Sequence, residues 1–362
     1  MNKLIMILIL LTLVVSAIFY ISEYNNEGEA SKTNLVTQSL PNQTVVKQEK
    51  KYIKNIKNSK VTIENDEMVI YRTKDNEVQI YSFLPDDNIL ITVFERKAWG
   101  TWNIGGWYIA KDKKIPSKNY YLIAGGHSDW EYALRVRKDL KKKYGFSGGS
   151  HGKEYMKTLK LLNPDDDSNI WVKKGDFKIV KQLKIEEKTF LTTTPEYNTK
   201  YAEVERTYIV SPAEISLKSN FKFTSNVFMG TSYVCMLPMP KEYGRYVWFE
   251  GTLDFVTTPK KGETVANTNI ENYYGKEKST EVRVWGDTNP AYVFEVSILN
   301  KDMVDNFKNS LKTFYWDINK EANKLYFSKF ETDQDEKINK GTEWENYSEW
   351  KLHVAPEALA MK

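Results

Sequence analysis

Short runs of alternating polar and apolar residues recur from about residue 61 to the C-terminus. The runs "KVTIEND", "EMVIYRT" and "EVQIYSF" place β-branched and aromatic residues at every second position, and turn residues separate them. Helical periodicity is sparse, and its best candidates are 128–143 and 301–312. We therefore predict an all-β fold with little helix, and the length favours a large antiparallel β-sandwich of the supersandwich type.

The N-terminus has a different pattern. One cation, Lys3, precedes an uninterrupted apolar run over 4–21, which is typical of an export segment. Residues 1–22 are expected to be either a signal peptide, cleaved near Ala17, or an N-terminal membrane anchor. A polar, lysine-rich linker is predicted over 23–60, followed by an extracytoplasmic β-rich domain over 61–362.

Composition narrows the function classes. Aromatic residues make up 14% of the chain, with 23 Tyr and 10 Trp, which suits strands and sugar-facing surfaces. The net charge is only +4, from 52 basic and 48 acidic residues, so there is no electrostatic argument for nucleic-acid binding. A single cysteine, Cys235, excludes an internal disulfide and a multi-cysteine zinc site, and its apolar neighbours predict burial.

Two of the three histidines lie in glycine-rich turns on either side of one charged segment. His127 follows two glycines, and His151 stands between Ser150 and Gly152. The segment between them can be a strand, or a helix that begins with a capping box; we prefer a strand over 130–137 and a helical turn or loop over 138–144. Glycines beside a histidine let a ligand approach closely, so these two are candidates for function. The third, His353, is expected to be structural or exposed.

Proton abstraction next to a carboxylate is the chemistry that this set fits best, as in polysaccharide lyases. His127 and His151 would neutralise the substrate or accept protons, Arg135 would hold the uronate carboxylate, and Tyr208 or Tyr246 would be the acid or base. The substrate-binding candidates are two further arginines and three tryptophans in a segment expected to be a flexible loop: Arg137, Arg245, Trp99, Trp102 and Trp107.

Three other chemistries have weaker signals. A metal site could use His127, Asp129, Glu131 and His151, but no HExxH motif is present. A glycosidase needs a carboxylate pair that sequence alone does not identify. A serine triad could use Ser128 or Ser150, but no GxSxG motif occurs. We therefore predict neither a metal nor a cofactor.

Two functions follow from this reading. The first is an exported glycan-active enzyme, a polysaccharide lyase that cleaves acidic polysaccharide by β-elimination. The alternative is a non-catalytic cell-surface module that binds carbohydrate or wall polymer through its Trp and Tyr side chains. The expected partners are a polysaccharide or cell-wall glycan and, through the N-terminal segment, the membrane. The enzyme needs histidine, arginine and tyrosine side chains in one cleft, whereas the module needs only an exposed aromatic platform.

Overall fold

A computed structural model describes residues 51–54, 60–126, 128–194, 200–331 and 334–355. His127, the predicted export segment 1–22 and most of the predicted linker lie outside these residues. Contacts define one compact unit over Gln48–Lys362. In the described ranges, no helix has both the length and the apolar character needed to cross a membrane.

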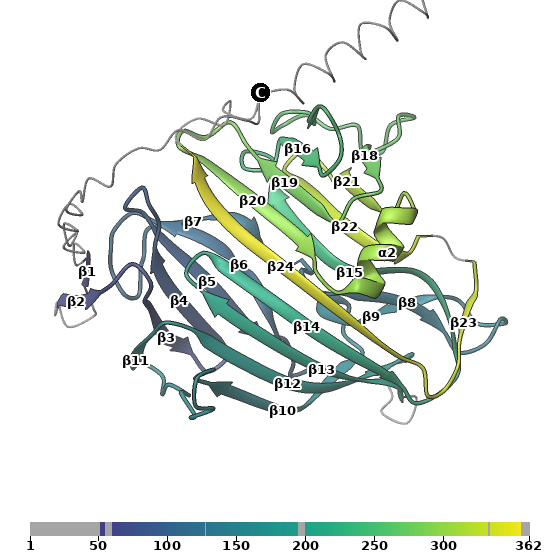
Figure 1. Cartoon of the computed structure of the whole chain (residues 1–362), viewed down its shortest axis with the longest axis horizontal. Helices are drawn as coiled ribbons and strands as arrows, with labels where there is room; N and C mark the ends of the chain where they lie inside the picture. The colour runs from purple at the N-terminus through teal and green to yellow at the C-terminus, as the bar shows by residue number, and fades with distance from the viewer. Residues whose placement is uncertain (1–50, 55–59, 127, 195–199, 332–333, 356–362) are drawn as a thin grey trace, which may run out of the picture. The chain divides into compact units, whose positions relative to one another are not determined.

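The described part of the chain forms four antiparallel sheets (Figure 1). The nine-stranded sheet has the order β10 (Glu154–Leu162), β12 (Leu183–Thr192), β13 (Lys200–Ser211), β14 (Glu214–Phe223), β24 (Glu343–Ala355), β20 (Ala291–Ile298), β19 (Glu281–Trp285), β16 (Tyr246–Phe249) and β17 (Val256–Thr257). The six-stranded sheet has the order β11 (Phe177–Val180), β3 (Met68–Lys74), β4 (Glu77–Phe83), β5 (Ile89–Arg96), β6 (Trp102–Ala110) and β7 (Tyr120–Gly125).

The seven-stranded sheet carries the candidate site. Its order is β18 (Tyr273–Glu277), β21 (Thr313–Asp317), β22 (Ala322–Phe330), β15 (Val227–Pro240), β8 (Ala133–Arg137) and β9 (Gly145–Ser147), and β23 (Glu336–Ile338) also pairs with β15. A small fourth sheet joins β1 (Lys51–Lys54) to β2 (Lys60–Ile63). Outside the sheets, the described residues also form the α-helix α2 (Lys301–Asn309) and the 3-10 turn η1 (Gly149–His151).

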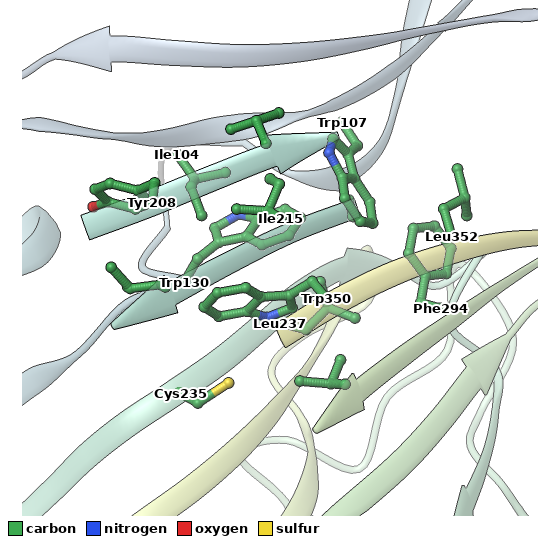
Figure 2. Packing of buried hydrophobic residues seen from close by; sticks show 14 of the residues in the cluster. Ile104, Trp107, Trp130, Tyr208, Ile215, Cys235, Leu237, Phe294, Trp350 and Leu352 are labelled. Atoms are coloured by element: carbon green, nitrogen blue, oxygen red, sulfur yellow. The ribbon is translucent and has the colours of Figure 1, made fainter. Parts of the chain in front are cut away.

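One cluster of buried side chains takes members from all three large sheets. Phe94 comes from β5, Tyr208 from β13 and Cys235 from β15, and each is at most 1% exposed. Figure 2 shows Tyr208 and Cys235 in this cluster, together with the indoles of Trp107, Trp130 and Trp350. The apolar positions of the alternating strands thus face a shared core, and the predicted all-β sandwich is confirmed.

Local expectations met mixed outcomes. Strand β8 covers much of the segment expected as strand, and α2 lies inside the helix candidate 301–312. Strand β1 lies within the predicted linker, so the folded part begins earlier than residue 61.

The aromatic loop expected around Trp102 and Trp107 is wrong, because both residues belong to strand β6. Its glycines serve strand pairing instead. Gly106 is opposite Gly125 of β7, and a Cβ on Gly125 would lie 2.5 Å from the Gly106 Cα. Two glycines are therefore needed where these strands approach so closely.

Candidate functional site

The two glycine-rich turns meet at one pocket of about 550 Å³. Gly125, Gly126 and Ser128 line it from the first turn, and Ser150 and His151 line it from the second. The rest of its wall includes 238–240 at the end of β15 together with Lys324 and Tyr326 of β22. Position 127 lies outside the described residues, but the residues on both sides of it line this pocket.

The second turn is built around the carboxylate of Asp129. The backbone N–H of Ser150 donates to Asp129 Oδ1. Gly149 has φ +53°, and a Cβ there would lie 2.0 Å from the same oxygen. Glycine at 149 therefore lets the turn close onto Asp129, which is only 5% exposed.

Asp129 also lies close to two bases in the pocket. Its Oδ2 is 3.5 Å from His151 Nε2 and 3.9 Å from Lys324 Nζ. Burial lowers the pKa of His151, partly opposed by the Asp129 charge, so its imidazole is neutral at neutral pH. Burial also lowers the pKa of Lys324 to about 8, against the attraction of Asp129 and Glu131.

A continuous row of aromatic rings leads from this pocket across the seven-stranded sheet. His151 stacks on Phe146 with ring centroids 4.7 Å apart. Each further ring lies close to the one before it. The centroid distances between consecutive rings are 6.2 Å for Phe146–Tyr233, 4.5 Å for Tyr233–Tyr326, 5.1 Å for Tyr326–Phe314, 5.1 Å for Phe314–Tyr273 and 4.5 Å for Tyr273–Trp316. We call Phe146, Tyr233, Tyr326, Phe314, Tyr273 and Trp316 the aromatic row.

The aromatic row lies on the sheet face that is turned away from the core. Successive strand residues point to opposite faces, and Tyr315, Leu325 and Phe327 all belong to the buried cluster. Their neighbours in the row, such as Trp316 and Tyr326, therefore point outward, and both are half-buried. The ring of Phe314 is the exception, at 2% exposed.

Sequence reasoning missed the aromatic row and Lys324. The signal was present in "KTFYWDI" and "KLYFSKF", where aromatic residues occupy both faces of a strand. A strand with one solvent face normally carries polar residues there. Large aromatics at those positions therefore indicate a surface that contacts something else.

Arg135 and Arg137 do not line the pocket. Arg135 faces Phe146 across the β8–β9 pair, with its guanidinium 5.7 Å from that ring. Arg137 forms an ion pair with Asp335 and lies 4.6 Å from the Tyr144 ring.

Tyr208 is fully buried rather than placed in the pocket. Its hydroxyl donates to Glu131 Oε1 at 3.2 Å, and that carboxylate also accepts from the Ile104 N–H at 2.7 Å. Glu131, considered above as a metal ligand, is therefore turned into the core and is only 1% exposed. Neutral and backbone donors satisfy it there.

Tyr246 and Arg245 form a separate cluster at β16. The Tyr246 hydroxyl donates to Asp287 at 2.6 Å, and Arg245 contacts the same carboxylate at 2.9 Å. Neither residue lines the pocket of His151.

The three tryptophans are also dispersed. Trp107 is fully buried, and Trp102 packs edge-on against Trp171 with centroids 5.9 Å apart. Trp99 is half-buried beside the second glycine turn, where a Cβ on Gly152 would lie 3.4 Å from its ring. None of the three lines the pocket. Of the predicted site residues with a described position, the structure thus places His151 in the pocket and Arg135 near it.

Of the metal ligands considered above, Asp129 and His151 lie side by side, but Glu131 is turned into the core. Over the described ranges, no three His, Cys, Asp or Glu side chains are grouped so that they could hold a metal ion.

Comparison with known proteins gives only distant likenesses. No protein-family model matches the chain, and no curated protein matches it. Among solved structures, an α-galactosidase from Lactobacillus brevis has a TM-score of 0.44 and 7% identity over 79% of this chain and 40% of its own. The α-galactosidase AgaB from Geobacillus stearothermophilus has a TM-score of 0.42 and 8% identity, over 79% and 41%.

An α-N-acetylgalactosaminidase from Bifidobacterium bifidum has a TM-score of 0.33 and 8% identity, over 80% of this chain and 36% of its own. The chain spans well under half of the length of these three proteins. Likenesses this weak carry no argument about this chain, and the described residues define an all-β sandwich with an aromatic-lined sheet face on their own evidence.

Proposed function

We propose that the protein binds a glycan along the aromatic row, outside the cytoplasm, with one sugar residue in the pocket of His151. The aromatic row carries this proposal. A sugar ring presents an apolar C–H face that packs on aromatic rings and a rim of hydroxyls that needs polar partners. The half-buried outward rings of the aromatic row can pack on the C–H face. The polar groups of the adjoining pocket can bond to the hydroxyls.

The charges around the row favour an acidic glycan. Arg135 lies 5.7 Å from the Phe146 ring, and Lys324 lies 5.2 Å from the Tyr326 ring. Cations held beside stacking rings attract a uronate carboxylate while the rings hold its pyranose. The apolar run over 4–21 supports the location, since an export segment of this kind places the folded part outside the cytoplasm.

A second candidate is catalysis in the same pocket, by β-elimination from the acidic glycan. The observation that favours it is the neutral, partly exposed imidazole of His151 with the Asp129 carboxylate 3.5 Å behind it. Such an imidazole can accept the C5 proton, and the carboxylate stabilises the imidazolium that forms. Lys324 or Arg135 would neutralise the uronate.

Binding is tested by titrating uronate-containing glycans into the protein and its Tyr326→Ala variant in a calorimeter. Loss of a stacking ring should weaken binding by about 1–3 kcal/mol, or roughly 5- to 150-fold. Tyr120→Ala is the matched control, because Tyr120 is an exposed tyrosine on β7, outside the row. Equal binding by the parent protein and Tyr326→Ala would contradict the proposal.

Elimination is tested by following the near-ultraviolet absorbance of unsaturated products over the same glycans. We expect a signal from the parent protein and none from His151→Ala. Glycan binding without any unsaturated product would reject the enzyme and leave the binding module.

A further inference from the structure

A serine and a buried lysine are in direct contact in the pocket. Lys324 Nζ donates a hydrogen bond to Ser128 Oγ at 2.9 Å. Both residues line the pocket, Ser128 is half-buried, and Lys324 is 6% exposed. The nearest carboxylate, Asp129, is 3.9 Å from Nζ, so the serine hydroxyl is the closer of the two oxygens.

We propose that Ser128 and Lys324 are a nucleophile and general base that remove ester-linked acyl groups, and that the substrate is an O-acylated glycan. Only the glycan part rests on the proposed function; the acyl transfer rests on the Ser128–Lys324 contact. A serine hydroxyl is a weak nucleophile until an adjacent base takes its proton, and a lysine amine serves when it is neutral.

The surroundings of Lys324 make a neutral amine available from about pH 8 upward, whereas the ammonium predominates at lower pH. Burial lowers its pKa to about 8, while Asp129 and Glu131 favour the ammonium. The Asp129 carboxylate also contacts His151, with Oδ2 3.5 Å from Nε2. The Tyr326 ring lies 5.2 Å from Lys324 Nζ. Because the lowered pKa is near 8, about half of the molecules carry the free base at that pH.

The reaction balances without a further reagent. The Lys324 amine takes the proton from Ser128 Oγ, the oxygen attacks the acyl carbon, and the carbonyl electron pair moves to its oxygen. When the pair returns, the C–O bond to the sugar breaks, and the departing oxygen takes the proton from the Lys324 ammonium. Water then attacks the acyl-serine in the same way, which releases the carboxylic acid and restores both side chains.

Two glycines fix the backbone of the turn that carries Ser128. Gly125 and Gly126 have φ of +102° and +84°, and both line the pocket beside Ser128. A Cβ on Gly126 would lie 2.8 Å from Leu122 Cδ2. Glycine at both positions therefore lets this turn pack closely against the protein, which sets where Ser128 lies in the pocket.

The test uses the full chain and 4-nitrophenyl acetate, an acyl donor without a sugar. We expect hydrolysis that rises with pH through about 8 and falls by about 100-fold or more in Ser128→Ala. Ser168→Ala and Lys337→Met are controls at exposed positions and should match the parent protein. In Lys324→Met we expect the hydrolysis to be lost, and with it the rise in rate through about pH 8.

Adduct mapping on the parent protein keeps the test independent of how the variants fold. A fluorophosphonate probe should modify Ser128, as located by peptide mass spectrometry. Modification elsewhere, or parent-like hydrolysis by Ser128→Ala, would overturn the inference.

The two proposals fail in different ways. Glycan binding with an unmodified Ser128 would reject the acyl transfer alone. Ser128 modification without glycan binding would retain the acyl transfer and reject the glycan as its substrate.

Discussion

The Asp129 carboxylate organises the pocket at the scale of single residues. It accepts from the Ser150 N–H and lies within 4 Å of His151 and Lys324, so one buried charge holds the turn and both bases. The turn can approach this carboxylate only because residue 149 has no side chain. Position 149 therefore has two requirements, a left-handed backbone and empty space, and these can be separated by experiment.

Gly149→Ala should destabilise the protein by more than Gly175→Ala. Both glycines have positive φ, +53° and +85°, so both substitutions strain the backbone by about 1 kcal/mol. A Cβ at 175 meets nothing within 4 Å, whereas one at 149 meets Asp129 Oδ1 at 2.0 Å. We expect an additional loss of about 1–3 kcal/mol for Gly149→Ala, measured by urea unfolding. Equal losses would show that Asp129 does not limit the turn.

The sequence allowed part of this site to be predicted. Two histidines among glycines mark turns that need close approach, and His151 does line the pocket. Lys324 could not be found in the same way, because it is about 200 residues from Ser128 along the chain and its burial results from sheet packing. Tyr208 was expected in the site but lies in the core. Alternation along a strand does not tell which of its two faces is covered.

At the scale of elements, the neighbouring strands β12 and β13 carry a buried ion pair that contacts the six-stranded sheet. Glu187 and Arg206 are cross-strand neighbours, are each 1% exposed and bond to one another. The backbone of Trp102 on β6 completes the contact: its N–H donates to Glu187 at 3.0 Å, and its carbonyl accepts from Arg206 at 3.2 Å. The pair thus ties the nine-stranded sheet to the six-stranded sheet.

Arg206→Met should destabilise the protein more at pH 8 than at pH 5. Burial raises the pKa of Glu187 to about 7 even with the opposing attraction of Arg206. Without Arg206 the carboxyl keeps its proton to still higher pH, so the folded state holds a proton that the unfolded state releases above pH 4.5. The free energy of unfolding of the Arg206→Met variant therefore falls as the pH rises, by up to about 3–5 kcal/mol at pH 8.

Urea unfolding of the parent and variant at both pH values measures this effect. Lys188→Met is the control, because Lys188 pairs with Glu205 in the same strand ladder but in solvent. Its cost should be below about 1 kcal/mol at either pH. A pH-independent cost for Arg206→Met would contradict the proposed role of Glu187.

At the scale of the whole molecule, one buried cluster joins the three large sheets. Period-two patterning was sufficient to predict an all-β fold, because it buries one face of each strand, and the chain length then favoured a sandwich. The division into sheets could not be predicted, since strand order depends on pairings such as β14 with β24 across more than a hundred residues. The outward aromatic row was missed for the same reason, because its six rings come from five strands that are far apart in the sequence.

A shared core predicts that the sheets unfold together. Guanidinium unfolding followed by tryptophan fluorescence and by far-ultraviolet circular dichroism should give coincident transitions. The native spectrum should be dominated by strand. Separated transitions would show that the six-stranded or seven-stranded sheet is stable without the nine-stranded one.

The single thiol of Cys235 can report how often the core of the molecule opens. Its side chain is 0% exposed in the shared core, and burial raises its pKa, so the native protein withholds it from alkylating reagents. With no second cysteine in the chain, each labelling event records one opening of the sandwich at β15. The dependence of the labelling rate on reagent concentration would then separate how often that region opens from how long it stays open.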